Sequence, residues 1–126
     1  MGQKSHADTS WLIALFNPDD LHHAQALREL EELTSPPSIS SLALAELLVD
    51  FDQSDSVSIP IALNQIQKSF SPVIAITTEI AVRAAEVRSH HKVTLADAIV
   101  IASALHERSH LLTFDKSMKA TYERIK

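Results

Sequence analysis

The sequence predicts an α/β fold in which a short parallel sheet of about four to five strands lies between two layers of helices. Short strand-like segments at 38–40, 72–76 and 110–114 alternate with longer segments of helical periodicity. Such alternation is typical of a parallel sheet covered on both faces. The segment 95–105 is apolar nearly all round, as expected of a buried central helix. The 126 residues, 45% of them hydrophobic, are enough for one domain spanning 1–126.

The individual elements follow from local signals. Pro36-Pro37 separates two segments, Ser41 is a candidate helix cap, and Pro60 suits a first helical turn. The expected strands are a segment ending near Asp8, then 38–40, 72–76 and 110–114. The expected helices are a turn within 11–16, then 21–33, 41–49, 60–70, 78–88 and 95–105, and a short last helix after Asp115. The polar segment 53–58 is predicted to be a loop.

Composition excludes several functional classes. The chain has no cysteine, so disulfides, thiolate zinc sites and cysteine nucleophiles are absent. The one glycine is Gly2, so no glycine-rich phosphate loop or dinucleotide-binding turn exists within the chain. No apolar run approaches the roughly 20 residues of a membrane span, and the first residues lack the apolar core of a secretory signal. We therefore expect a cytoplasmic protein without a membrane partner.

The formal net charge is -5, whereas nucleic-acid binders are more often basic. The charge counts against strong autonomous nucleic-acid binding. It counts less against a metal-dependent nuclease, because such a site needs clustered acids and its bound cations reverse the local charge.

Four acids stand out by their context. Asp8 and Asp115 each follow a predicted strand, at the edge where open parallel sheets bind ligands. Glu46 and Asp97 interrupt apolar helical segments. A lone buried carboxylate is costly unless it is paired, hydrogen-bonded or bound to a metal.

Each acid also has a purely structural explanation. Asp8 and Asp115 could cap the helices that follow them, and Thr94 with Asp97 fits a capping box. Glu46 is harder to explain in this way, although a buried pair with an arginine remains open. Caps and a metal site are compatible, because a capping carboxylate keeps free oxygen atoms.

Taken together, four acids at one end of a sheet would repel one another and some would take up protons. A divalent cation resolves that repulsion, and oxygen-only ligands suit Mg2+ or Mn2+. Such ions support hydrolysis of a phosphodiester bond. The sequence therefore predicts a metal-binding and catalytic group of Asp8, Glu46, Asp97 and Asp115.

The remaining polar residues give weaker signals. Basic residues before the Asp97 helix and after Asp115 could flank an acidic pocket, and an ordinary solvated face is an equal alternative. The seven histidines lack the spacing of a zinc protease site, and surface positions are expected for pairs such as His22-His23.

Four motifs in order resemble those of PIN-domain proteins, and specifically the VapC class of type II toxin-antitoxin ribonucleases. They are Asp8-Thr9-Ser10-x-Leu12-Ile13-Ala14-Leu15, Ser41-x-x-x-Ala45-Glu46, Leu95-Ala96-Asp97-Ala98-x-x-x-Ala102 and Leu111-Leu112-Thr113-x-Asp115. Together they span nearly the whole chain. The family often has proline where this chain has Ala96, and the polar first strand near 4–7 is a further departure.

The resemblance implies a three-layer α/β/α domain with an endoribonuclease site that uses Mg2+ or Mn2+. It implies Asp8, Glu46, Asp97 and Asp115 as metal ligands, and a homodimer neutralised by a cognate antitoxin protein. Further matches to supporting positions of the family are Thr9, Ser10 and Thr113.

Two other functions compete with an RNA-cleaving enzyme. The acidic charge and the atypical first strand are compatible with a non-catalytic PIN-like module that binds RNA or a protein. A different acid-pocket α/β protein, a phosphatase or phospho-receiver, is disfavoured. Ser10 stands where such a phosphatase has a second aspartate, and Lys116 is poorly placed for a receiver.

Overall fold

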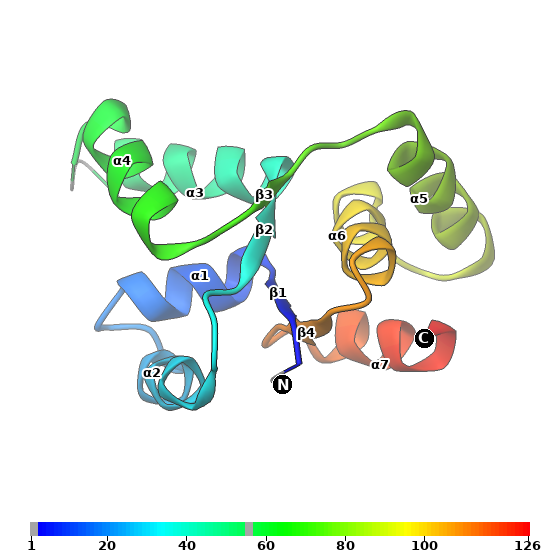
Figure 1. Cartoon of the computed structure of the whole chain (residues 1–126), viewed down its shortest axis with the longest axis horizontal. Helices are drawn as coiled ribbons and strands as arrows, with labels where there is room; N and C mark the ends of the chain where they lie inside the picture. Colours follow the sequence, from blue (N-terminus) through cyan, green and yellow to red (C-terminus); the bar gives the residue numbers. More distant parts are fainter. Residues whose placement is uncertain (1–2, 55–56) are drawn as a thin grey trace.

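The structure is a computed structural model that describes residues 3–54 and 57–126. Within these ranges it contains four strands and seven helices (Figure 1). The strands are β1 (Ser5–Ala7), β2 (Ser38–Ser40), β3 (Val73–Ile74) and β4 (His110–Leu112). The helices are α1 (Thr9–Phe16), α2 (His23–Glu32), α3 (Ser41–Gln53), α4 (Ile59–Ser69), α5 (Thr78–His90), α6 (Leu95–His106) and α7 (Lys116–Ile125).

The four strands form one parallel sheet in the order β3-β2-β1-β4. The strand β1 is central, with Ala7 opposite Ile39 of β2 on one side and Leu112 of β4 on the other. Helices α1 to α4 lie on one side of this sheet and α5 to α7 on the other (Figure 1). The predicted α/β architecture with two helical layers is confirmed, at the lower end of the expected strand number.

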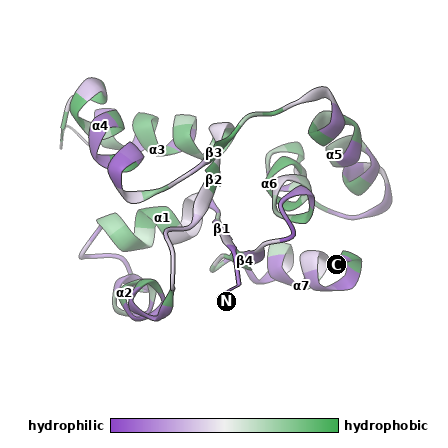
Figure 2. Ribbon diagram, in the orientation of Figure 1, coloured by the Kyte–Doolittle hydropathy of each residue, from purple (hydrophilic) through white to green (hydrophobic). Residues whose placement is uncertain are grey.

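Each face of the sheet has its own hydrophobic core. One core joins Ala7 and Ile39 to buried residues of α1, α3 and α4, including Trp11 and Leu47. The other joins Leu111 to residues of α5, α6 and α7. Helix α6 is hydrophobic along most of its length (Figure 2), and it contributes buried residues from Ala98 to Ala104 as the sequence predicted.

The polar strand β1 is entirely buried. His6 is fully inaccessible, and its Nδ1 lies 2.7 Å from the Ser38 hydroxyl oxygen of the neighbouring strand. Burial lowers the pKa of His6 to about 4, so the imidazole is neutral at physiological pH. The hydrogen bond to Ser38 satisfies one ring nitrogen of His6, whereas its Nε2 is buried without a hydrogen-bond partner among the described residues. His6 is thus buried, unlike the surface positions expected for pairs such as His22-His23.

Several boundaries differ from the expected ones. The cap of α3 is Ser40, whose hydroxyl accepts the Ala43 N–H, and not Ser41. Helix α3 extends to Gln53, and β3 is limited to two residues of the predicted 72–76. Gly2 and part of the predicted loop 53–58 lie outside the described residues. No helix in the described part of the chain combines the length and apolar character that crossing a membrane requires.

Candidate active site

The parallel pairing of β1 and β4 brings two of the predicted acids to one edge of the sheet. Asp8 directly follows β1, and its backbone N–H donates to the Leu112 carbonyl at 3.0 Å. Asp115 follows β4 after two further residues. Because both strands run in the same direction, their carboxyl ends open on the same side.

Asp8 is buried and densely hydrogen-bonded, with 2% of its surface exposed. Its carboxylate accepts the Trp11 N–H at 2.9 Å, which caps α1, and the Ser10 hydroxyl at 2.8 Å. The Thr113 hydroxyl donates to the second carboxylate oxygen. Burial nevertheless raises the pKa of Asp8, and the nearby Asp115 adds to the rise. The predicted capping role is confirmed, yet the fold holds this carboxylate where ionisation is disfavoured.

Asp115 is half-buried and caps α7 by accepting the Met118 N–H at 3.0 Å. Its own N–H donates to the Thr113 hydroxyl oxygen at 3.0 Å. Since the same hydroxyl donates to Asp8, Thr113 links the two aspartates. The short turn between β4 and α7 thus fixes the separation of both carboxylates.

Glu46 is exposed, which corrects the expectation of a buried carboxylate. Ala43 and Leu47 of helix α3 are buried in the core, and Glu46 lies at the flank of this buried face, three residues after Ala43. No arginine pairs with Glu46 among the residues that the structure describes. Its carboxylate instead accepts the Thr9 hydroxyl at 2.6 Å, which joins α3 to α1.

Asp97 lies in the first turn of α6 and is half-buried. Its N–H donates to the Thr94 hydroxyl oxygen at 3.1 Å, which is half of the predicted capping box. Burial raises the pKa of Asp97, and the charges of Asp115 and Glu46 raise it further. Four carboxylates from four separate segments therefore influence one another.

A small cavity of about 110 Å³ lies where these segments meet. No lysine or arginine lines it. Among the described residues, no three histidine, aspartate or glutamate side chains already have an arrangement that would hold a metal ion. The lining residues are Asp8, Thr9, Ser10, Glu46, Ala96, Asp97, Val100, Asp115 and Met118. The fold thus gathers the four predicted acids around a cavity whose lining supplies no basic side chain.

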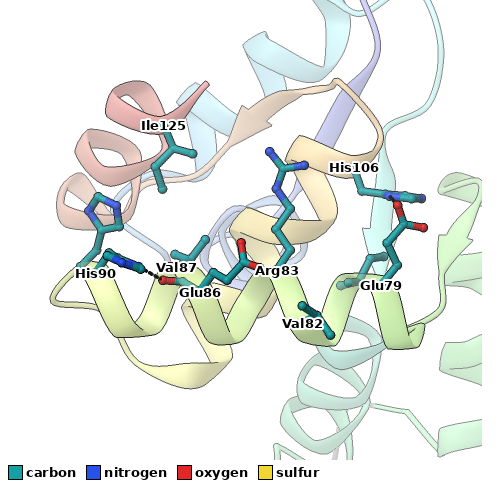
Figure 3. A pocket seen from close by; sticks show the side chains of 10 residues that line it. Glu79, Val82, Arg83, Glu86, Val87, His90, His106 and Ile125 are labelled. Atoms are coloured by element: carbon teal, nitrogen blue, oxygen red, sulfur yellow. Dashed lines mark hydrogen bonds and ion pairs between the residues drawn. The ribbon is translucent and has the colours of Figure 1, made fainter.

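A larger cavity, of about 420 Å³, lies along α5 (Figure 3). Glu79 reaches toward His106, with 3.9 Å between carboxylate and imidazole, and the Arg83 side chain extends between α5 and α6. Further along, Glu86 and His90 also line it. Arg83 and His90, from the basic segment expected beside the acids, line this cavity and not the carboxylate one.

Sequence reasoning missed an aromatic pair beside the acids. His22 stacks on Phe114, with ring centroids 4.4 Å apart and an angle of 8° between the planes. The sequence predicts a surface position for His22 and places Phe114 in a strand, so it does not predict that the two rings meet. The one available signal was an aromatic residue directly before a candidate catalytic acid.

The fold is similar to several solved structures. The Mycobacterium tuberculosis toxin VapC20, described as cleaving the sarcin-ricin loop, is 22% identical with a TM-score of 0.79, over 93% of this chain and 94% of that one. A toxin-antitoxin complex from Klebsiella pneumoniae is 27% identical with a TM-score of 0.77, over 90% and 89%. VapBC2 from Rickettsia felis, bound to a DNA fragment from their promoter, is 19% identical with a TM-score of 0.71, over 92% and 91%.

Comparison with curated proteins found no match. Comparison with protein families matched residues 7–124 to the PIN domain, a span that begins just before Asp8 and ends beyond Asp115. Since this match covers nearly the whole chain and the fold agrees with it, the chain belongs to the PIN domain family.

Proposed function

We propose that this protein is an endoribonuclease that hydrolyses RNA phosphodiester bonds with Mg2+ or Mn2+. The observation that carries the proposal is the convergence of Asp8, Glu46, Asp97 and Asp115 on one cavity with no basic side chain in its lining. Burial and mutual repulsion raise the pKa of two of these acids. A divalent cation is the partner that such a group lacks.

The donor set fits a hard cation, because the lining offers carboxylate and hydroxyl oxygens and contains no histidine. Asp8 and Asp115 are held by fixed hydrogen bonds, whereas Glu46 is exposed on a longer side chain. Glu46 and Asp97 would therefore be the side chains that move when the four carboxylates close around a metal ion. When bound, Mg2+ or Mn2+ would supply a nucleophilic water and charge stabilisation for the leaving oxygen.

The hydroxyl groups around the acids have positioning roles in this proposal. Ser10 and Thr113 both donate to Asp8, which keeps its carboxylate oriented even though burial disfavours its charge. Thr9 donates to Glu46 and thereby limits the motion of an exposed side chain. Partners of this kind orient metal ligands and tune their basicity.

The biological setting is proposed by analogy. VapC20 is described as a toxin that cleaves the sarcin-ricin loop, and another similar structure is a toxin-antitoxin complex. We accordingly propose that the chain is the toxin of a VapBC-type pair, acts in the cytoplasm on RNA, forms a homodimer and is neutralised by a cognate antitoxin.

The test is cleavage of single-stranded RNA by the purified protein with Mn2+ or Mg2+ added. EDTA and the Asp97→Asn substitution are each expected to abolish cleavage. The matched control is Glu86→Gln in the α5 cavity, which should cleave as the wild type does. Cleavage that survives both EDTA and Asp97→Asn would refute the proposal.

A second candidate is a non-catalytic PIN-like module that binds RNA or a protein partner. It is favoured by the net charge of -5 and by the absence, among the described residues, of a ready arrangement of three metal ligands. Calorimetric titration with Mn2+ separates the two. Carboxylate-dependent binding supports the enzyme, and no binding supports the module.

A further inference from the structure

A second cavity adjoins the carboxylate cavity. It has a volume of about 380 Å³ and shares two lining residues, Ser10 and Asp115, with the smaller one. Its complete lining is Ser10, Ile13, Asp20, His22, Phe114 and Asp115. A group bound in this second cavity would therefore lie beside Asp115, one of the four carboxylates.

The wall of this cavity contains the stacked pair of His22 and Phe114. The two rings are 4.4 Å apart at their centroids and within 8° of parallel. Both residues are half-buried. His22 precedes α2 and Phe114 precedes α7, so the pair joins two segments that are distant in sequence.

Hydrogen bonds hold both members of the pair at the backbone. The His22 N–H donates to the Asp20 carboxylate at 2.8 Å. The Phe114 N–H donates to the Ser10 hydroxyl oxygen at 3.1 Å, and that same hydroxyl donates to Asp8. The ring pair is thus tied to the carboxylate site through Ser10.

The chemistry of the lining indicates what the cavity would accept. Asp20 and Asp115 repel a phosphate group, so a phosphate is a poor occupant. Flat aromatic and imidazole rings stack with unpaired nucleobases, which are uncharged. A carboxylate such as that of Asp20 accepts hydrogen bonds from base amino groups, and Ile13 adds an apolar wall.

We propose that one unpaired nucleobase of the RNA stacks on the outer face of the His22–Phe114 pair, next to the phosphate that is cut. This inference rests on the proposed nuclease function and adds to it the group that positions the substrate. It predicts that the substrate is single-stranded at this nucleotide, because a base-paired nucleotide cannot enter the cavity.

Binding is tested by NMR titration of the purified protein with adenosine and, separately, with ribose, which lacks the base. Adenosine is expected to shift the ring resonances of His22 and Phe114, whereas ribose should leave them unchanged. No shift with adenosine, or equal shifts with both compounds, would overturn the inference. This test does not depend on RNA cleavage, so it decides the subsite even if the proposed nuclease activity fails.

Kinetics of RNA cleavage provide the second readout. His22→Asn keeps the backbone donor and removes the ring, and is expected to raise KM about 10-fold with little change in kcat. His22→Phe keeps a stacking ring and should retain KM near the wild-type value. The control His90→Asn makes the same change in the α5 cavity and should have no effect. An unchanged KM in His22→Asn would overturn the stacking role.

Discussion

Two buried polar groups on and beside β1 are treated in opposite ways by the fold. His6 is fully buried within the sheet, and burial lowers its pKa to about 4, so that it is neutral and hydrogen-bonded to Ser38. Asp8 lies two residues further, is 2% exposed, and burial raises its pKa, but three donors favour its charged form. The fold thus keeps His6 uncharged, whereas it supplies Asp8 with hydrogen-bond donors that favour its charged form.

The difference separates a polar group that serves the fold alone from one that is proposed to bind a metal ion. His6 has a neutral partner, and the side chains beside it add no repulsion to its pKa shift. Burial raises the pKa of Asp8, and the charge of the neighbouring Asp115 adds to this rise. Repulsion that the chain itself does not relieve points to an external cation. The predictions below test this contrast.

The largest effect is expected for Asp8→Asn. If Asp8 is a metal ligand, cleavage of RNA should fall at least about 100-fold, since changes to the outer partners of metal ligands alone cost about 10- to 100-fold. The free energy of unfolding at pH 7 without divalent ions should not fall, because the variant carries no buried charge. Cleavage assays measure the activity, and urea denaturation measures the free energy of unfolding. A variant that is active, or that is inactive only because it unfolds, would contradict the proposed difference between His6 and Asp8.

The next largest effect concerns His6 and pH. Its pKa is 6.5 in the unfolded chain and about 4 in the fold, so between these values the unfolded chain binds a proton that the folded chain does not. Stability is therefore lost as pH falls through this window, by on the order of 3 kcal/mol. Urea denaturation from pH 7 to pH 4 measures the loss. It should be smaller in His6→Leu, and an identical pH slope in both proteins would contradict the prediction.

Divalent cations are expected to stabilise the fold by about 2 to 3 kcal/mol at 100 times the dissociation constant. In the fold, the pKa values of Asp8 and Asp97 lie above 3.8, the value in the unfolded chain. Without a cation, the free energy of unfolding therefore decreases as pH rises from 3.8 through the folded pKa values. Thermal unfolding at pH 7 with and without Mn2+ measures the gain. Asp97→Asn should diminish it. A rise of equal size in this variant would show that the ion binds elsewhere.

The smallest effect is expected for Thr9→Val, which removes the hydrogen bond to Glu46. Stability should fall by about 1 kcal/mol or less because Glu46 is exposed. Cleavage should fall about 10-fold through lost orientation of Glu46. Thr9→Ser keeps the hydroxyl and should retain activity. Equal activity of the Val and Ser variants would remove Thr9 from the positioning role.

Much of the fold was predictable because its signals are local. Thr94, Asp8 and Asp115 mark helix starts that the structure confirms. The extent of β3 was not predictable, because only Val73 and Ile74 pair with β2 although the apolar pattern extends from 72 to 76. Ser40 rather than Ser41 caps α3 because β2 continues directly into the helix, which adjacent serines cannot reveal.

The four acids of the candidate site could be selected from sequence because each follows a strand or interrupts an apolar helix. The sequence could not predict which of the four acids is buried, since Glu46 is exposed although its neighbours in sequence are apolar. The stacking of His22 on Phe114 joins residues 92 positions apart, as their numbers show, and no local pattern encodes it. Likewise, the accommodation of His6 depends on Ser38 of another strand.

The pairing of β1 with β4 has a consequence for how the protein is made. Asp8 is synthesised 105 residues before Thr113, so the hydrogen bond between them and the neighbour Asp115 exist only after residues 110–115 have been added and β4 has docked. Closing so long a loop is slow compared with local helix formation. During translation the growing chain therefore carries only part of the site. Under the proposed activity, the growing chain has no complete nuclease site until residues 110–115 have been made and have docked.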